Sequence, residues 1–148
     1  MITIKNRQKK IPINTQKLEL KIQKILHHLG YDDYDIGLLI TTNKTIRNLN
    51  KEYRHKDKAT SILSFSFHPE LKAGHKIKAA SEDEKNLGDI IISAQYLKDD
   101  APTWNQSFEQ RLHAIVVHGI CHLLGYTHDD DKEYAKMQKI EAELLSVN

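Results

Sequence analysis

Residues 107–128 read SFEQRLHAIVVHGICHLLGYTH, and this stretch decides the fold. Ser107 offers a helix N-cap, and Gln110 three positions later completes a capping-box pattern. Apolar residues recur from there to Leu124, and Gly125 then supplies the left-handed backbone conformation that ends many helices. The sequence therefore predicts one long helix at the centre of the molecule, with the remaining elements packed around it.

Elements of both kinds are expected around this helix. The stretch 69–86 is rich in Lys, Glu, Ala and Ser and is predicted to be a solvated surface loop. Because helices and strands follow one another without strict alternation, we expect a single α+β domain over residues 1–148, with a small mixed sheet of about four strands and about five helices. Strands are predicted at residues 2–4, 36–40, 61–67 and 87–93, and further helices over 14–29, 43–53, 94–100 and from 129 onward. In the third strand, one face carries Leu63, Phe65 and Phe67.

The composition is typical of a soluble globular protein. Hydrophobic residues make up 39% and charged residues 28% of the chain, which gives no support to general disorder. No apolar run approaches the roughly 20 residues of a membrane-spanning helix, and Met1 leads into a polar strand, so we expect no membrane partner and a cytoplasmic location. The single cysteine, Cys121, agrees with a reducing compartment. A net charge of +2 is too small to identify a nucleic-acid-binding protein by itself.

Three histidines in the opening stretch have the spacing of metal ligands. His118 and His122 are four residues apart, so a helix places them one turn apart on the same face. Gly125 lets the chain turn back, and His128 can then complete a set of three nitrogens. Three protein ligands leave a fourth position for water, which is the pattern of a catalytic zinc. Cys121 points to another side of the helix and is expected to pack inside.

One zinc ion is the cofactor that three imidazoles favour. Nickel, cobalt or copper can occupy the same ligands, because the order of affinities alone does not choose the metal in cells. With nine histidines in the chain, packing or capping near a helix end is the competing explanation. The third histidine, placed after a glycine, favours the metal site. Arg111, seven residues before His118, is expected to share the histidine face.

A zinc protease is the first alternative function. The histidines and the glycine match the metzincin pattern H-E-x-x-H-x-x-G-x-x-H. These proteases use the glutamate of this pattern as a general base, but residue 119 here is glycine, which cannot accept a proton. A peptidase built this way would lack its usual base.

The complete run HGICHLLGYTH, residues 118–128, resembles the signature H-G-x-x-H-L-x-G-Y-x-H of the YbeY family, in which glycine is expected at this second position. LNKEYRHKDKATSILSF at 49–65 and LGDI at 87–90 are similar to two further segments of that family. The resemblance implies a metal-dependent, single-strand-specific endoribonuclease that acts in ribosomal RNA maturation, at the 3′ end of 16S rRNA, and in ribosome quality control. RNA and the ribosome or its proteins are the partners that it implies.

The resemblance also implies roles for individual residues. His118, His122 and His128 correspond to the metal ligands, and Arg54 corresponds to the arginine implicated in ribonuclease activity. Two positions depart from the family pattern. Residue 127 is a threonine where aspartate commonly precedes the last histidine, and residue 61 is a serine where aspartate commonly follows the threonine. The first departure concerns the surroundings of the ligands, and the second concerns the support of Arg54.

One face of the helix predicted at 43–53 is basic, and positive charge continues into the loop after it. Ile46, Leu49 and Tyr53 are expected on the opposite face. Such a stripe can follow a phosphate backbone, although charged helix faces are also common without any function. Besides Arg54, the basic stripe consists of Lys44, Arg47, Lys51, Lys56 and Lys58.

The mechanism that we hypothesise is phosphodiester hydrolysis. The ion would activate water and polarise a phosphoryl oxygen, while Arg54 would hold the phosphate as negative charge builds up. The sequence leaves open whether water or the ribose 2′-hydroxyl attacks. A second alternative is a ribosome-associated assembly module without catalysis, whose metal site is mostly structural.

Overall fold

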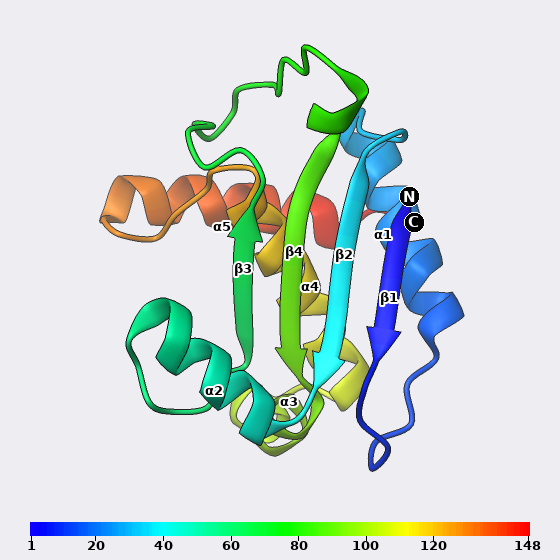
Figure 1. Ribbon diagram of the computed structural model, residues 1–148, viewed down its shortest axis with the longest axis vertical. Coiled ribbons are helices and arrows are strands. Elements are labelled where there is room, and N and C mark those ends of the chain that lie inside the picture. Colours follow the sequence, from blue (N-terminus) through cyan, green and yellow to red (C-terminus); the bar gives the residue numbers. More distant parts are fainter.

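One mixed sheet forms the centre of the computed structural model, which describes residues 1–148 (Figure 1). Its strands are β1 (Ile2–Asn6), β2 (Asp35–Thr41), β3 (Ile62–Ser66) and β4 (Asn86–Ser93). They lie in the order β1-β2-β4-β3, and β1, β2 and β4 run parallel. Strand β3 pairs antiparallel with β4 and lies at the edge of the sheet, so no strand pairs with its other side.

Five α-helices and two short 3-10 turns complete the chain. The helices are α1 (Thr15–Leu29), α2 (Asn43–Arg54), α3 (Ala94–Asp100), α4 (Phe108–Leu123) and α5 (Asp131–Leu145), and the 3-10 turns are Glu82–Glu84 and Ala101–Trp104. The predicted capping box begins α4, because Ser107 Oγ accepts from Gln110 N at 3.1 Å and Gln110 Oε1 accepts from Ser107 N at 2.9 Å. None of the helices is both long enough and apolar enough to span a membrane. The predicted α+β class, with four strands and five helices in one small domain, is confirmed.

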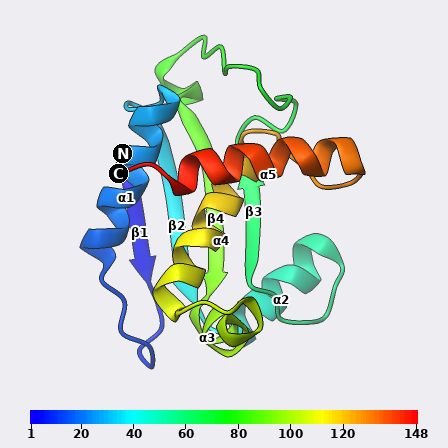
Figure 2. The same cartoon turned by 180° about the vertical axis from the view of Figure 1, so that it is seen from behind.

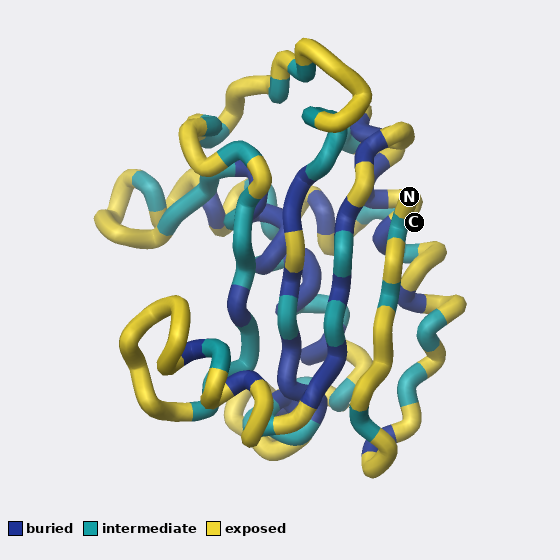
Figure 3. Tube along the Cα trace, in the orientation of Figure 1, coloured by how far each residue is buried: buried dark blue, intermediate teal, exposed yellow.

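Three helices cover one face of the sheet. Helices α1, α4 and α5 lie behind it in Figure 1 and toward the viewer in Figure 2, whereas α2 lies on the opposite face beside β3. Nine residues of α4 are buried, and its apolar side chains belong to a core cluster of 25 residues. Buried positions concentrate along β2, β4 and α4, while the loops are mostly exposed (Figure 3). Burial of this apolar surface is the main stabilising contribution to the fold, and α4 is its central helix, as predicted.

The inner face of β3 packs directly on α4. A Cβ atom added to Gly119 would lie only 2.7 Å from Ile62 Cδ1 and 3.0 Å from Ile90 Cδ1. Further along the strand, Ser66 Oγ donates a hydrogen bond to Leu123 O at 3.0 Å. The absence of a side chain at residue 119 thus lets the helix approach the edge strand closely.

The aromatic face of β3 points away from this core. Leu63 and Phe65 face the side of α2, where the Phe65 ring packs edge-on against Tyr53 with centroids 5.4 Å apart. Phe67 follows the strand and is 47% exposed. The predicted alternation is therefore present, but its aromatic face builds a small cluster beside α2.

The loop from 69 to 86 is more packed than the sequence suggested. Most of its residues are exposed, yet Leu71, Ile77 and Ala79 lie against the core. Gly125 has φ of 92°, and a Cβ atom there would lie 2.3 Å from Leu71 O. The turn after α4 therefore requires glycine both for its backbone conformation and for the close approach of this loop.

Candidate metal centre

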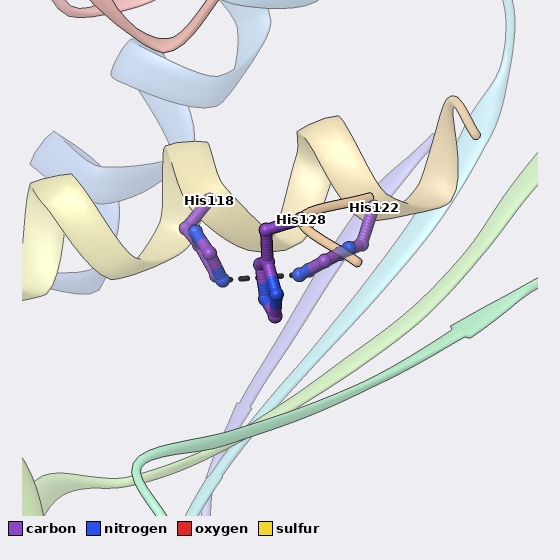
Figure 4. Close-up of side chains that lie close together, drawn as sticks. All are labelled: His118, His122 and His128. Atoms are coloured by element: carbon purple, nitrogen blue, oxygen red, sulfur yellow. Dashed lines mark hydrogen bonds between the residues drawn. The ribbon is translucent and has the colours of Figure 1, made fainter. Parts of the chain in front are cut away.

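Helix α4 presents His118 and His122 side by side in its last two turns (Figure 4). Their Nε2 atoms are 3.0 Å apart, and their ring centroids are 4.5 Å apart. Both residues are half-buried. The i, i+4 spacing has therefore brought two imidazole nitrogens to one point, as predicted.

The turn at Gly125 returns the chain so that the His128 ring comes close to the other two rings (Figure 4). Its ring centroid is 5.7 Å from that of His118 and 5.1 Å from that of His122. One potential ligand atom from each histidine lies within 4.8 Å of the other two. The structure brings together all three residues that the sequence singled out.

The outer ring nitrogens of two histidines face groups that only accept hydrogen bonds. His122 Nδ1 is 2.9 Å from Tyr126 O, and His118 Nδ1 is 3.4 Å from Glu141 Oε2. A carbonyl or carboxylate oxygen requires the proton on Nδ1, which leaves a lone pair on each Nε2 of the neutral rings. Two lone pairs 3.0 Å apart repel each other unless a proton or a metal cation lies between them.

The nitrogen separations fit a tetrahedral zinc-type site. With Zn–N bonds of about 2.0–2.1 Å and tetrahedral angles, ligand nitrogens would stand roughly 3.3 Å apart. The observed 3.0 Å between His118 and His122 is close to this value. No cysteine or acidic residue joins the cluster, and Cys121 is fully buried with the pKa of its thiol raised by burial to about 12. The three histidines can therefore supply three ligands to a metal ion.

Burial favours the neutral form of the two helical histidines of the cluster, His118 and His122. Burial lowers the pKa of His118 to about 4, and His128 and Arg111 lower it further in the same direction. Burial, followed by the neighbouring His118, also lowers the pKa of His122. Neutral imidazole is the form that binds metal, so these histidines are ready to act as ligands near pH 7.

The same pKa shift predicts acid sensitivity of the metal-free protein. Between pH 6.5 and about 4, His118 takes up a proton more readily in the unfolded chain than in the folded one. Its contribution to stability is therefore complete above pH 6.5 and is lost as the pH falls toward 4. We expect the free energy of unfolding, measured by denaturant titration with chelator present, to drop by up to about 3 kcal/mol over this range. The drop should be smaller in His118→Ala, and equal drops in both proteins would contradict the assignment.

Residue 119 leaves no room for the general base of a zinc protease. Gly119 faces Ile62 and Ile90 in the contact between α4 and the sheet. A glutamate there would push its carboxylate into apolar side chains, at a cost of several kcal/mol unless it found a partner. The site therefore has neither the general base that a zinc protease of this type uses nor the space for one.

Arg54 lies at the C-terminal end of α2, against the free edge of β3. Its Nη2 donates to Ser64 O at 3.0 Å, and its guanidinium carbon is 4.6 Å from the centroid of the Phe65 ring. Ile62 and Ser66, on either side of Ser64, face α4. The edge strand thus lies between Arg54 and the helix that carries the histidines.

The basic stripe is exposed along its whole length, but one member is already paired. Arg47 Nε lies 2.8 Å from Asp57 Oδ1, in the loop that follows α2. The four lysines of the stripe form no ion pair. The buried residues of α2 are Ile46 and Asn50, whereas Tyr53 is 55% exposed. Asn50 holds the following loop by donating from Nδ2 to Lys58 O at 2.9 Å.

Sequence reasoning missed the contacts behind the cluster. Glu141 of α5 approaches His118, although 23 residues separate them and no local pattern links them. Arg111 was placed on the histidine face, and its burial and its ion pair with Asp100 at 3.4 Å were not foreseen. Its guanidinium carbon also lies 4.4 Å from the ring centroid of Trp104. Such contacts depend on packing between elements, which spacing within one helix does not reveal.

The mixed sheet, the central helix and the histidine cluster define an α+β protein with a candidate three-histidine metal centre beside an edge strand. A family model described as Endoribonuclease YbeY matches residues 3–147. Human Endoribonuclease YbeY is 35% identical over 144 residues, which cover 97% of this chain and 86% of the relative. The Geobacter metallireducens Endoribonuclease YbeY is 36% identical over 148 residues, which cover 99% and 94% of the two chains.

A solved structure has the same fold. The solution structure of the Thermotoga maritima protein TM1509 superposes with a TM-score of 0.61 and 25% identity, covering 97% of this chain and 89% of that one. The chain belongs to the YbeY family. Its relatives are named endoribonucleases, so the predicted family and enzyme class, a hydrolase that acts on RNA, are confirmed.

Proposed function

We propose that this endoribonuclease cuts single-stranded RNA at a metal centre formed by His118, His122 and His128. The observation that carries the proposal is the 3.0 Å distance between the Nε2 atoms of His118 and His122, whose Nδ1 atoms both face oxygen acceptors. A cation held by both Nε2 atoms offsets the repulsion between their lone pairs. Zinc is the ion that a set of three imidazoles favours, and nickel or another divalent ion fits the same donors. Family membership supports RNA as the substrate.

The protein's own residues divide the chemistry between them. A divalent ion, when bound, supplies a Lewis acid that activates water near neutral pH and neutralises charge on a phosphoryl oxygen. Arg54 uses one N–H donor on Ser64 O, so the other donors of its guanidinium are free for phosphate. Stacking on Phe65 fixes the plane of the guanidinium, which favours paired hydrogen bonds to two phosphate oxygens. Arg54 thereby holds the scissile phosphate against the free edge of β3.

The basic stripe supplies the path by which RNA reaches Arg54. Lys44, Lys51, Lys56 and Lys58 are exposed and can contact successive phosphates. Arg47 contributes less, because RNA must first displace Asp57 from its side chain. These contacts follow the backbone and carry no information on base sequence.

The position of Arg54 speaks against the peptidase alternative. A peptide substrate that pairs with an edge strand needs the strand's free N–H and carbonyl groups. On β3, Arg54 already occupies Ser64 O, one of the acceptors that such a peptide would use. Together with the glycine at 119, this contact favours a phosphate substrate over a peptide.

Ribosomal RNA is the substrate that we infer, with cleavage at the 3′ end of 16S rRNA and a role in ribosome quality control. The names of the relatives support RNA cleavage in general. Contact with the ribosome or its proteins would bring the RNA to the centre. We place this activity in the cytoplasm, where ribosomes are assembled.

Metal dependence of RNA cleavage tests the proposed function. Zinc-loaded wild-type protein should cut a labelled single-stranded RNA, chelator should stop the reaction, and added zinc should restore it. Analysis of the new ends separates two routes, because a 2′,3′-cyclic phosphate excludes direct attack by water. RNA binding without metal-dependent cleavage would instead favour the assembly module. Zinc-dependent digestion of an unstructured protein would instead support the zinc protease alternative.

A further inference from the structure

A carboxylate interrupts the apolar stripe of α5. Glu141 follows Met137 by four residues and precedes Leu144 by three, and both of these side chains are buried. The three residues therefore share the packed face of the helix. The Glu141 side chain is only 26% exposed, so it has lost much of its contact with water. Burial of an ionised group is costly unless a partner compensates for the lost hydration.

His118 is the partner that Glu141 meets. Glu141 Oε2 lies 3.4 Å from His118 Nδ1, at the long end of the hydrogen-bond range. Glu141 forms no other side-chain hydrogen bond or ion pair in the structure. The contact joins α5 to α4, two helices that cross one another in Figure 2. A carboxylate in this stripe is therefore accounted for by the histidine that it faces.

We propose that Glu141 is a positioning residue that orients the His118 ring for metal binding, an inference that rests on the proposed metal centre. Because the carboxylate only accepts hydrogen bonds, it keeps the proton on Nδ1 and leaves the Nε2 lone pair for the ion. Its negative charge also makes the imidazole a stronger donor to a cation. Glu141 thus acts on the ion through His118.

The other two histidines of the cluster have no comparable contact with a charged side chain. His122 Nδ1 faces a backbone carbonyl, Tyr126 O, which fixes the ring without a full charge. His128 is exposed and forms no hydrogen bond with the protein. Glu141 therefore supplies the one charged contact behind the cluster.

Glu141 is not itself a ligand in this arrangement. The ligand atoms that lie within 4.8 Å of one another come from the three histidines alone. Glu141 approaches the ring nitrogen of His118 that faces away from His122, since Nε2 is the atom that lies 3.0 Å from His122. Removing the carboxylate should consequently weaken metal binding without changing the number of ions bound.

Zinc affinity measured on the full chain tests this role. Competition with a chelating dye at pH 7 should give roughly 10–100-fold weaker binding for Glu141→Ala, the usual effect of losing a contact to a ligating histidine. Glu141→Gln keeps an acceptor oxygen but loses the charge, so its affinity should fall between those of wild type and Glu141→Ala. Saturated protein should still hold one zinc per chain in all three forms. Glu143→Gln is the matched control, because Glu143 lies on the same helix and pairs with exposed His28 at 3.0 Å.

The outcomes separate this inference from the metal centre itself. If wild type binds no zinc, the metal centre and the role of Glu141 are both wrong. If wild type binds zinc and Glu141→Ala binds it equally tightly, only the role of Glu141 is overturned. Thermal unfolding of each metal-free variant checks that the fold is retained. A variant with a lower Tm and unchanged zinc affinity would show that the carboxylate serves packing alone, and loss of one zinc per chain would make it a ligand.

Discussion

His122→Ala is expected to abolish tight metal binding and to lower the rate of RNA cleavage by roughly a thousandfold. His122 Nε2 is one of the two nitrogens that meet at 3.0 Å, and its ring is fixed by Tyr126 O. Only His118 and His128 would remain as ligands, because no acidic residue or cysteine belongs to the cluster. Metal content per chain after gel filtration and single-turnover cleavage of a single-stranded RNA measure the two effects.

The matched control for this variant is His113→Ala. His113 is another half-buried histidine of α4, and it lies outside the cluster. The control should keep one ion per chain and the rate of the wild type. If His122→Ala cut RNA as fast as the wild type, a contaminating nuclease would explain the activity, and the proposed centre would be wrong.

The features that could be predicted from the sequence are those fixed by neighbouring residues. The capping box at Ser107 and Gln110 formed as its spacing indicated, and the turn at Gly125 followed from a backbone conformation that favours glycine. The pair His118 and His122 needs only one helical turn to meet. Each of these depends on local geometry, which a single sequence contains.

Features that depend on how elements pack against each other could not be predicted. The alternation in β3 did not reveal that Ile62 would face α4 while Phe65 faced α2, because both faces carry apolar residues. The contact of Leu71 O with the turn at Gly125 joins a loop to a helix end more than 50 residues away. The position of Glu141 behind His118 likewise requires the crossing of two helices.

The two departures from the family pattern also depend on this packing. Ser61 O accepts the backbone hydrogen bond of Ser93 N at 3.1 Å, while Arg54 is held by Ser64 O and Phe65. The serine at 61 therefore removes none of the contacts that hold Arg54 in this structure. Thr127 is half-buried in the turn before the last histidine and forms no side-chain hydrogen bond.

Arg54→Ala is expected to lower kcat for RNA cleavage by about a hundredfold while the metal content stays that of the wild type. The arginine contacts Ser64 O and the Phe65 ring, and neither belongs to the histidine cluster. Its free N–H donors should bind phosphate most strongly as charge builds up in the transition state, so its loss reduces kcat more than it raises KM. Arg54 is exposed, and the lost cation-π contact costs only about 0.5–1 kcal/mol of stability.

Two further variants distinguish the paired hydrogen bonds of the Arg54 guanidinium from the effect of its positive charge. Arg54→Lys keeps the charge but loses both the paired hydrogen bonds and much of the stacking on Phe65, so it should recover only part of the rate. Lys51→Ala removes a charge from the same helix face and should raise KM and weaken the salt dependence of binding, with kcat unchanged. Loss of metal from Arg54→Ala would contradict this division of roles, because it would mean that the arginine supports the ion and not the phosphate. If Arg54→Ala and Lys51→Ala had equal effects on kcat and KM, Arg54 would contribute only a positive charge to RNA binding and would have no special role in the transition state.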